Sequence, residues 1–161
     1  MATLTVWKFT DPEAADKAVA TLEGLAKQQL ITVQDAATVS WPSGAKKPKT
    51  RQLRSLTGAG ALGGAFWGLL FGLLFFIPLL GLAIGAGMGA LTGSMSDIGI
   101  DDDFIKRARD EITPGTSALF LMSSGAVVDK VRDAFRGEHA ELVSTNMSDE
   151  QERALREVFA E

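Results

Sequence analysis

The chain has 161 residues, enough for one domain or for one domain that carries an insertion. Its formal net charge is −4, whereas nucleic-acid-binding proteins usually carry a clustered basic surface, so no nucleic-acid partner is expected. The absence of cysteine excludes disulfides, thiolate metal ligands and a cysteine nucleophile.

The first part of the chain, residues 1–54, predicts a strand, a helix and a strand hairpin. Thr3–Phe9 alternates and is rich in β-forming residues. Asp11 is a suitable N-cap, and Pro12 fits the first helical position, where its missing N–H costs nothing. After this helix, a second strand at about Ala36–Trp41 and a short partner at Pro48–Gln52 flank a Pro-Ser-Gly turn.

The last part, residues 97–161, predicts two helices and two strands before a terminal helix. A charged helix covers Phe104–Ile112 and ends at Pro-Gly. Ser117–Met122 is a continuous apolar run, which is typical of a buried central strand. Ala126–Arg136 is amphipathic and predicts a helix, and Glu141–Thr145 predicts the last strand.

Without residues 55–96, the order of elements is strand–helix–strand followed by strand–helix–strand. Two such halves in one small sheet predict an α+β fold, a ferredoxin-like sandwich. We expect the helices to cover one face and to leave the other for water, a partner or the membrane surface. Ser148 and Gln151 have capping-box spacing and mark the start of the terminal helix.

Residues 55–96 contain no charged side chain, and eight of their glycines follow two runs of four-residue spacing. Residues four apart lie on one face of a helix, and small residues let helices approach closely in lipid. An antiparallel hairpin turning near Phe76 to Pro78 pairs the two runs. The predicted helix-packing residues are Gly60, Gly64, Gly68, Gly72, Gly81, Gly85, Gly89 and Gly93.

The two arms of this hairpin differ in the side chains that lie away from these glycines. The first arm is bulky there and predicts a lipid-facing surface: Phe66, Leu69, Leu70, Leu73, Phe75 and Phe76. The second arm is small there and predicts a homo-oligomer interface: Ala83, Ala86, Gly87 and Ala90. A helix that is small on two sides can pack against two neighbours.

Each arm runs for about 18 residues, or about 27 Å, close to the thickness of a bilayer core. A hairpin that crosses fully is expected to have polar residues at the far interface, but this turn holds none. The hairpin therefore either crosses fully or is re-entrant. In the competing interpretation it is buried inside a soluble oligomer. A basic run precedes the first arm and predicts contact with lipid headgroups: Lys46, Lys47, Lys49, Arg51 and Arg54. By the positive-inside rule, the soluble domain faces the cytoplasm of a bacterial inner membrane.

No residue cluster predicts catalysis, a cofactor or a metal site. Gly58–Gly63 matches the letters of the dinucleotide fingerprint, but no strand precedes it and no acidic residue follows at the required distance. Asp97 and Asp101–Asp103 lack the spacing of a calcium loop and suit helix capping instead. His139 is the single histidine and suits a surface position. Trp7 and Trp41 lie on predicted strands and suit the core.

Three stretches resemble a bacterial family of predicted membrane proteins, the domain-of-unknown-function family 1269. They are Leu30–Val39, the Gly-rich hairpin and Ile112–Leu121, of which the Pro-Gly-Thr-Ser-Ala-Leu-Phe segment is the most specific. The resemblance implies a bacterial inner-membrane setting and a stress-related role. It brings no catalytic residues.

The sequence therefore predicts a non-enzymatic, homo-oligomeric membrane scaffold whose partners are lipid and further copies of the chain. Two alternatives stay open. One is a small pore lined by the second arm, whose apolar interior would gate by dewetting. The other is a small-molecule sensing α+β module tethered to the membrane, which fold analogy alone supports.

Overall fold

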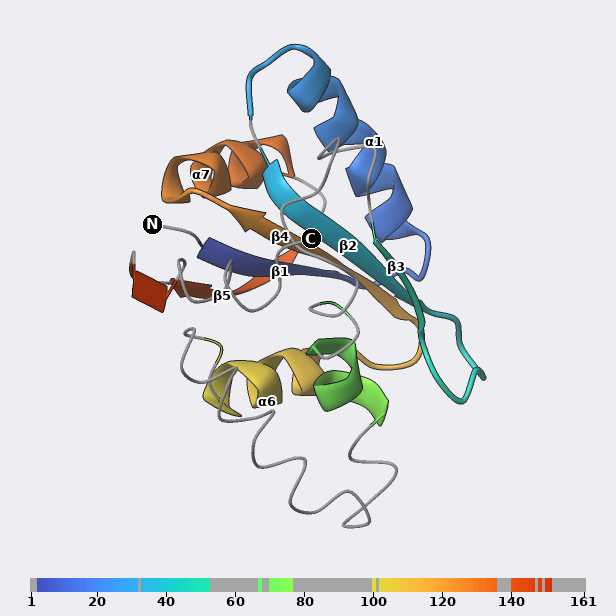
Figure 1. Ribbon diagram of the computed structural model, residues 1–161. Helices are drawn as coiled ribbons and strands as arrows, with labels where there is room; N and C mark the ends of the chain where they lie inside the picture. Colours follow the sequence, from blue (N-terminus) through green and yellow to red (C-terminus); the bar gives the residue numbers. More distant parts are fainter. Residues whose placement is uncertain are drawn as a thin grey trace.

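The computed structural model describes residues 3–31, 33–52, 67, 70–76, 100, 102–135, 140–146, 148, 150 and 151. They form a five-stranded antiparallel sheet with the strand order β3-β2-β4-β1-β5 (Figure 1). The strands are β1 (Thr3–Phe9), β2 (Val33–Trp41), β3 (Lys49–Gln52), β4 (Thr116–Ser123) and β5 (Glu141–Asn146). The predicted α+β class is confirmed.

β4 is the central strand of the sheet, between β2 and β1, and every residue of β4 is buried. Because side chains alternate between the faces of a strand, its apolar run serves two cores. Leu119 and Leu121 belong to one core, whereas Phe120 and Met122 belong to the other. The continuous apolar run therefore predicted a strand that is covered on both sides.

Helices α1 (Ala14–Lys27) and α7 (Gly125–Ala134) cover one face of the sheet, which we call the helix face (Figure 1). Each helix follows one strand and leads to another, so the crossovers of the two halves place both helices on this side. Val19 and Leu22 of α1 pack in one core with Val131 of α7. Trp7 of β1 lies in the same core, as its position on a strand predicted.

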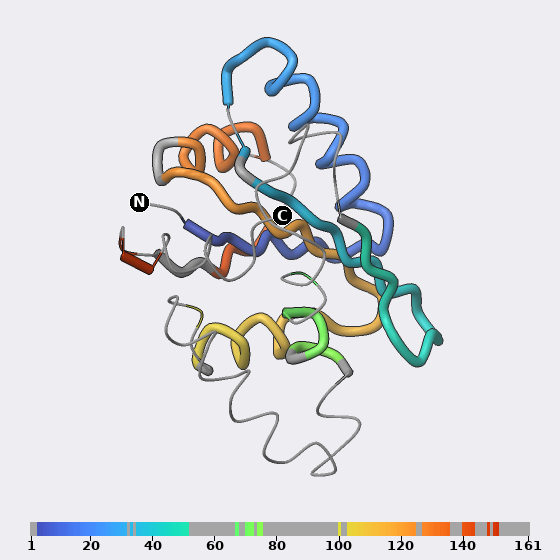
Figure 2. The backbone as a smooth tube through the Cα atoms, viewed as in Figure 1, coloured from blue at the N-terminus to red at the C-terminus, as the bar shows by residue number. Residues whose placement is uncertain are grey.

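The opposite face is covered by helix α6 (Asp102–Glu111) and by part of the predicted first arm. We call this part the aromatic segment: Trp67, Leu70 and Phe71, followed by the π-helix η1 (Gly72–Phe76). Figure 2 shows η1 and α6 side by side beneath the sheet, on the side away from α1. We call this side the aromatic face.

The expectation that one face of the sheet stays uncovered is wrong. Trp67, Phe71 and Leu74 are buried in a single core with Phe120 of β4 and Phe104 of α6. Two side chains of the predicted lipid-facing surface, Leu70 and Phe75, are not exposed in this structure, because the same core buries them. A sheet face that bears Val6, Val39 and Phe120 exposes apolar surface, and the aromatic segment removes that surface from water.

Local signals fixed several element boundaries correctly. The Ser148 and Gln151 side chains each accept a hydrogen bond from the other residue's backbone N–H, at 3.1 and 2.9 Å, which confirms the capping box. The start of α1 differs from the prediction. Glu13 is the N-cap, while Asp11 Oδ1 accepts the Glu13 N–H at 2.8 Å. Gly44, at φ 86°, makes the predicted turn between β2 and β3.

Among the described residues, no helix combines the length and apolar character needed to span a bilayer. Of the predicted helix-packing glycines, only Gly72 is described, and it begins the π-helix. The others lie outside the described residues, as do the predicted interface residues Ala83, Ala86, Gly87 and Ala90. Their roles stay predictions.

Candidate functional site

The strip of sheet formed by β2 and β3 on the helix face carries polar residues. Ala36 of β2 still belongs to the apolar core, but Thr38 and Ser40, which follow it on the same face, are polar. β3 pairs Arg51 with Thr38 and Lys49 with Ser40. Hydroxyls and cations therefore form this edge of the helix face.

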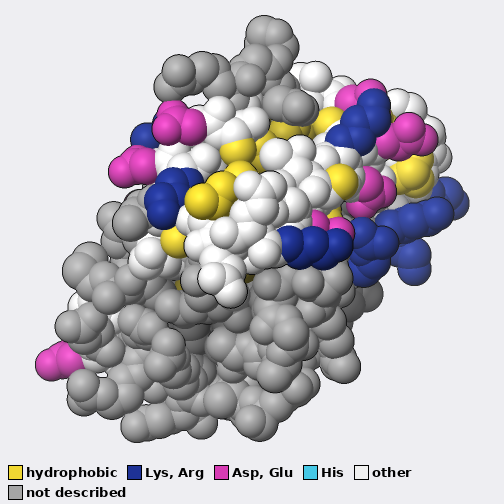
Figure 3. Space-filling view, turned by 90° about the horizontal axis from the view of Figure 1, so that it is seen from above, with side chains coloured by type: hydrophobic (Ala, Val, Ile, Leu, Met, Phe, Trp, Pro, Cys, Tyr) yellow, Lys and Arg dark blue, Asp and Glu magenta, His cyan; other side chains and the backbone are white. Residues whose placement is uncertain are grey.

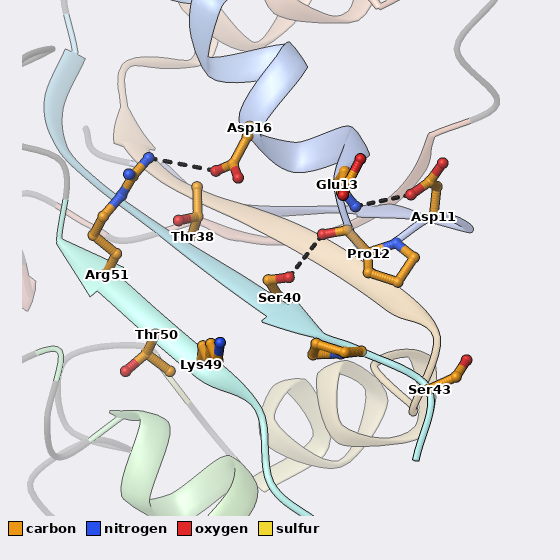
Figure 4. A pocket seen from close by; sticks show the side chains of 11 residues that line it. Asp11, Pro12, Glu13, Asp16, Thr38, Ser40, Ser43, Lys49, Thr50 and Arg51 are labelled. Carbon is orange, nitrogen blue, oxygen red and sulfur yellow. Dashed lines mark hydrogen bonds and ion pairs between the residues drawn. The ribbon is translucent and has the colours of Figure 1, made fainter. Parts of the chain in front are cut away.

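A groove of about 630 Å³ lies over this strip, between the start of α1 and the β2–β3 hairpin (Figure 4). A volume of this size is within the range of about 300–1,000 Å³ that is usual for small-molecule sites. Its lining combines acidic residues at the α1 side, hydroxyls on β2 and in the hairpin turn, and cations on β3. The lining residues are Asp11, Pro12, Glu13, Asp16, Thr38, Ser40, Pro42, Ser43, Lys49, Thr50 and Arg51.

Several polar groups of the groove already have partners within it (Figure 4). Arg51 Nη2 lies 3.4 Å from Asp16 Oδ1, and the two side chains are 62% and 61% exposed. Ser40 Oγ donates to the Pro12 carbonyl at 2.7 Å. Asp11 accepts the Glu13 N–H. The first two contacts join the start of α1 to β3 and β2, so they connect the two walls of the groove.

Two charged side chains of the groove, Glu13 and Lys49, have no partner within the described part of the chain. Within the described part of the chain, neither the Glu13 carboxylate nor the Lys49 ammonium takes part in an ion pair or a side-chain hydrogen bond. Both residues are exposed. In Figure 4, Glu13 lies at the α1 wall and Lys49 at the β3 wall, with Ser40 between them. The groove thus presents the partnerless Glu13 carboxylate opposite the partnerless Lys49 ammonium, while Asp11 keeps its charge with a backbone N–H as its partner.

The predicted lipid-headgroup residues lie on or next to this groove. Lys46, Lys47, Lys49 and Arg51 are all exposed on the β2–β3 hairpin, and Lys49 and Arg51 line the groove. Figure 3 shows Lys and Arg side chains gathered at one end of the helix face, with acidic side chains beside them. Arg54 lies outside the described residues. Headgroup contact itself stays a prediction.

Sequence reasoning missed the acidic wall and the hydroxyl floor of the groove. In the sequence Asp11 suits a helix cap, and no pattern marks Glu13 or Asp16 as site residues. One signal was present in β2, where Ala36, Thr38 and Ser40 share a face and become polar toward the strand end. A strand that is covered along its whole length would continue its apolar pattern there.

A second polar cluster joins α6 to the sheet on the aromatic face. Lys8 Nζ of β1 lies 3.6 Å from Glu111 of α6 and 3.8 Å from Glu141 of β5. The hydrogen bond with Glu141 raises the pKa of Glu111 above 4.5, assisted by burial and by the charge of Glu141, while Lys8 opposes the increase. Nearby, Arg109 Nε donates to the Leu74 carbonyl at 3.2 Å, so α6 also holds the aromatic segment.

Other candidate residues from the sequence are not brought into a site. Asp102 and Asp103 lie in α6, whereas Asp97, Asp101, His139 and Gly58–Gly63 are outside the described residues. In the described ranges, no three His, Cys, Asp or Glu residues are grouped to hold a metal ion. Trp41 is half-buried, packs against Phe75 at 5.9 Å and donates its Nε1–H to the Ala45 carbonyl.

A family model described as "Protein of unknown function (DUF1269)" matches residues 61–160. The chain belongs to the DUF1269 family. The match includes α6, β4, α7 and β5 together with most of the Gly-rich stretch, and it leaves out the segment Leu30–Val39 that the sequence resemblance also used. No curated protein and no solved structure matches the chain.

Proposed function

We propose that this DUF1269 protein is a non-enzymatic scaffold that associates with a membrane and with further copies of itself. The observation that carries the proposal is the order of three features along the chain. The cations of the β2–β3 hairpin come first, β3 ends at Gln52, and the uncharged stretch 55–96 with its spaced glycines follows at once. A basic surface beside an apolar hairpin suits an anionic bilayer, where each cation near the surface contributes about 1 kcal/mol.

In this proposal the soluble part is a ferredoxin-like sandwich that carries the hairpin as an insertion. With β3 set aside, the elements β1, α1, β2, β4, α7 and β5 follow the β-α-β-β-α-β order of that fold. The sandwich faces the cytoplasm of a bacterial inner membrane, because Lys46, Lys47, Lys49 and Arg51 favour that side. The role is structural and stress-related, not catalytic.

The packing of the aromatic segment sets a condition on this proposal. Leu70, Phe71 and Phe75 are buried against the sheet, so full insertion of the first arm requires that they exchange the sheet for lipid. Lipid chains are as apolar as a protein core, so the exchange leaves these side chains in a similar environment. It also exposes Phe120 and its neighbours on the sheet. Insertion and the stability of the aromatic face are therefore coupled.

Membrane fractionation tests the first part of the proposal. Expressed full-length protein should pellet with membranes and resist extraction by carbonate and by high salt. Full recovery in the soluble fraction without detergent contradicts membrane insertion.

Cysteine crosslinking tests the hairpin, since the chain has no cysteine of its own. Gly64→Cys combined with Gly89→Cys should form a disulfide within one protomer, because the mirrored glycine runs place these positions opposite each other. A disulfide requires Cα atoms within about 7 Å. Ala86→Cys alone should crosslink two protomers through the predicted oligomer interface. Crosslinks of the Gly64/Gly89 pair that form only between protomers contradict the predicted register.

A second candidate function is the sensing of a small molecule by the α+β domain, and the groove favours it. The groove joins the start of α1 to the hairpin that leads into residues 55–96. A ligand held between these walls acts on the strand that precedes the predicted membrane segment. A ligand at 100 times its Kd raises the free energy of unfolding by about 2.7 kcal/mol, which a thermal-shift measurement detects.

A further inference from the structure

We propose that the groove between the start of α1 and the β2–β3 hairpin binds a small zwitterion that carries a primary ammonium and a phosphate group, as phosphoethanolamine does. This inference rests on the second candidate function and names its ligand class. It does not require the hairpin to insert into a membrane, because every residue invoked belongs to the described α+β domain.

The charge arrangement of the groove selects a zwitterion. Asp16 and Arg51 neutralise each other at 3.4 Å, and Asp11 Oδ1 caps the backbone N–H of Glu13. The unpaired Glu13 carboxylate and the unpaired Lys49 ammonium then lie on opposite walls (Figure 4). A ligand with one charge of each sign satisfies both groups at once. A simple anion gains Lys49 but meets Glu13, and a simple cation has the reverse problem.

A metal ion fits the groove poorly. Its three carboxylates are not grouped as metal ligands, in agreement with the lack of any such cluster in the described ranges. Asp11 and Asp16 are each engaged by a donor of the protein itself, which leaves Glu13 as the single carboxylate without a partner. One carboxylate suits an ammonium group, which donates up to three hydrogen bonds.

The Thr38 hydroxyl and the cations of β3 suit the phosphate end of the ligand. Thr38 pairs with Arg51 and Ser40 pairs with Lys49, so these four side chains share the helix face and line the groove, whereas Thr50 pairs with Val39 and points to the other face. Phosphate oxygens accept hydrogen bonds from hydroxyl and ammonium donors, and these bonds are strong because the acceptor is charged. Ser40 Oγ donates to Pro12, so its remaining hydrogen-bonding capacity is that of an acceptor, and it lies between the walls where the ammonium end approaches Glu13.

This chemistry has two sources, a free phosphorylated amine and the headgroup of phosphatidylethanolamine. The experiment has an arm for each. Calorimetric titration of full-length protein with O-phosphoethanolamine measures the free form. Flotation with phosphatidylcholine vesicles, with and without phosphatidylethanolamine, measures the headgroup. Phosphatidylcholine is the matched control because its quaternary ammonium has no N–H to donate to Glu13.

Two substitutions, Glu13→Gln and Lys49→Gln, test the two ends of the ligand. Each should weaken binding at least about tenfold, the loss expected when a hydrogen bond between charged groups is removed. Lys46→Gln is the matched control, because Lys46 is exposed on the same hairpin but does not line the groove. Glu13 makes no side-chain capping bond, so Glu13→Gln leaves α1 intact.

Binding in either arm that Glu13→Gln and Lys49→Gln both weaken, and that Lys46→Gln does not, supports the proposal and identifies the source. Three outcomes overturn it: no binding in either arm, binding that survives both substitutions, or inorganic phosphate binding as tightly as O-phosphoethanolamine. Pelleting of the same variants with membranes is measured independently, because it tests the scaffold proposal and not zwitterion binding. A protein that pellets with membranes but binds no zwitterion retains the scaffold proposal and loses this one.

Discussion

The two faces of the sheet are covered in different ways. On the helix face, α1 and α7 are crossover helices that connect strands of the sheet. On the aromatic face, the cover is α6 together with the aromatic segment, and the segment lies far from its sheet contacts in sequence. The helix face is built by the two βαβ units themselves. The aromatic face is completed by the aromatic segment, so side chains from the predicted membrane stretch are part of a protein core.

This difference explains why composition alone misled the prediction for the first arm. Bulky apolar side chains at helical spacing suit both lipid and the face of a sheet, because both environments are dry and apolar. Phe71 and Phe75 meet protein partners in this structure, Phe120 at 5.1 Å and Trp41 at 5.9 Å. Such partners come from strands that the local pattern of the arm does not contain.

The largest expected effect comes from neighbouring core residues of β4 that point to opposite faces. Phe120→Ala should lower the free energy of unfolding by about 3–5 kcal/mol, and Leu119→Ala by about 2–5 kcal/mol, because each leaves a cavity. Amide hydrogen exchange should then show which face of the sheet each substitution loosens. Phe120→Ala should speed exchange first in α6, which shares its core, and Leu119→Ala first in α1. Equal acceleration in both helices with both variants contradicts two separately packed faces.

A smaller effect is expected where α6 holds the aromatic segment. Arg109→Gln removes the 3.2 Å hydrogen bond to the Leu74 carbonyl and should lower the free energy of unfolding by about 1 kcal/mol. The control is Arg132→Gln on α7, which loses an exposed ion pair with Asp129 and should cost less than about 0.5 kcal/mol. Urea unfolding measures both. An Arg109 variant as stable as the Arg132 variant shows that α6 does not hold the segment through this bond.

The smallest effect is the pH dependence of the link between α6 and the sheet. The pKa of Glu111 is raised by its hydrogen bond with Glu141, so the folded state holds this proton more tightly than the unfolded state. The contribution of Glu111 is therefore fully present below about pH 4.5, the ordinary value, and is lost as the pH rises through the raised pKa. Glu111→Gln should flatten the unfolding free energy across that window. An unchanged pH profile in the variant assigns the dependence to another group.

Local patterns predicted most of the fold. The alternation of Thr3–Phe9, the apolar run in β4 and the capping box at Ser148 and Gln151 each specify a structure within a few residues. The α+β class follows from their order. The cover of the aromatic face was missed because it depends on contacts between residues such as Phe71 and Phe120, which no short pattern contains.

The candidate groove was not predicted, and of its residues the sequence marked only the cations, as lipid-headgroup contacts. Lys49 and Arg51 were found because cations cluster along the chain near them. Glu13 and Asp16 were missed because they reach the groove only when α1 packs over the sheet beside β2 and β3. A run of charged residues can be recognised in a sequence, whereas the opposite wall of a groove is formed only when distant elements pack together.

A double-mutant cycle on Phe71 and Phe120 tests the central claim, that the aromatic segment packs on the sheet. The two rings meet edge to face at 5.1 Å and 88°. The cycle compares the unfolding free energies of full-length protein, Phe71→Ala, Phe120→Ala and the double variant. The account predicts a coupling energy of about 0.5–1.5 kcal/mol, as edge-to-face pairs give. Strictly additive effects would mean that Phe71 does not touch the sheet, and they would contradict the account.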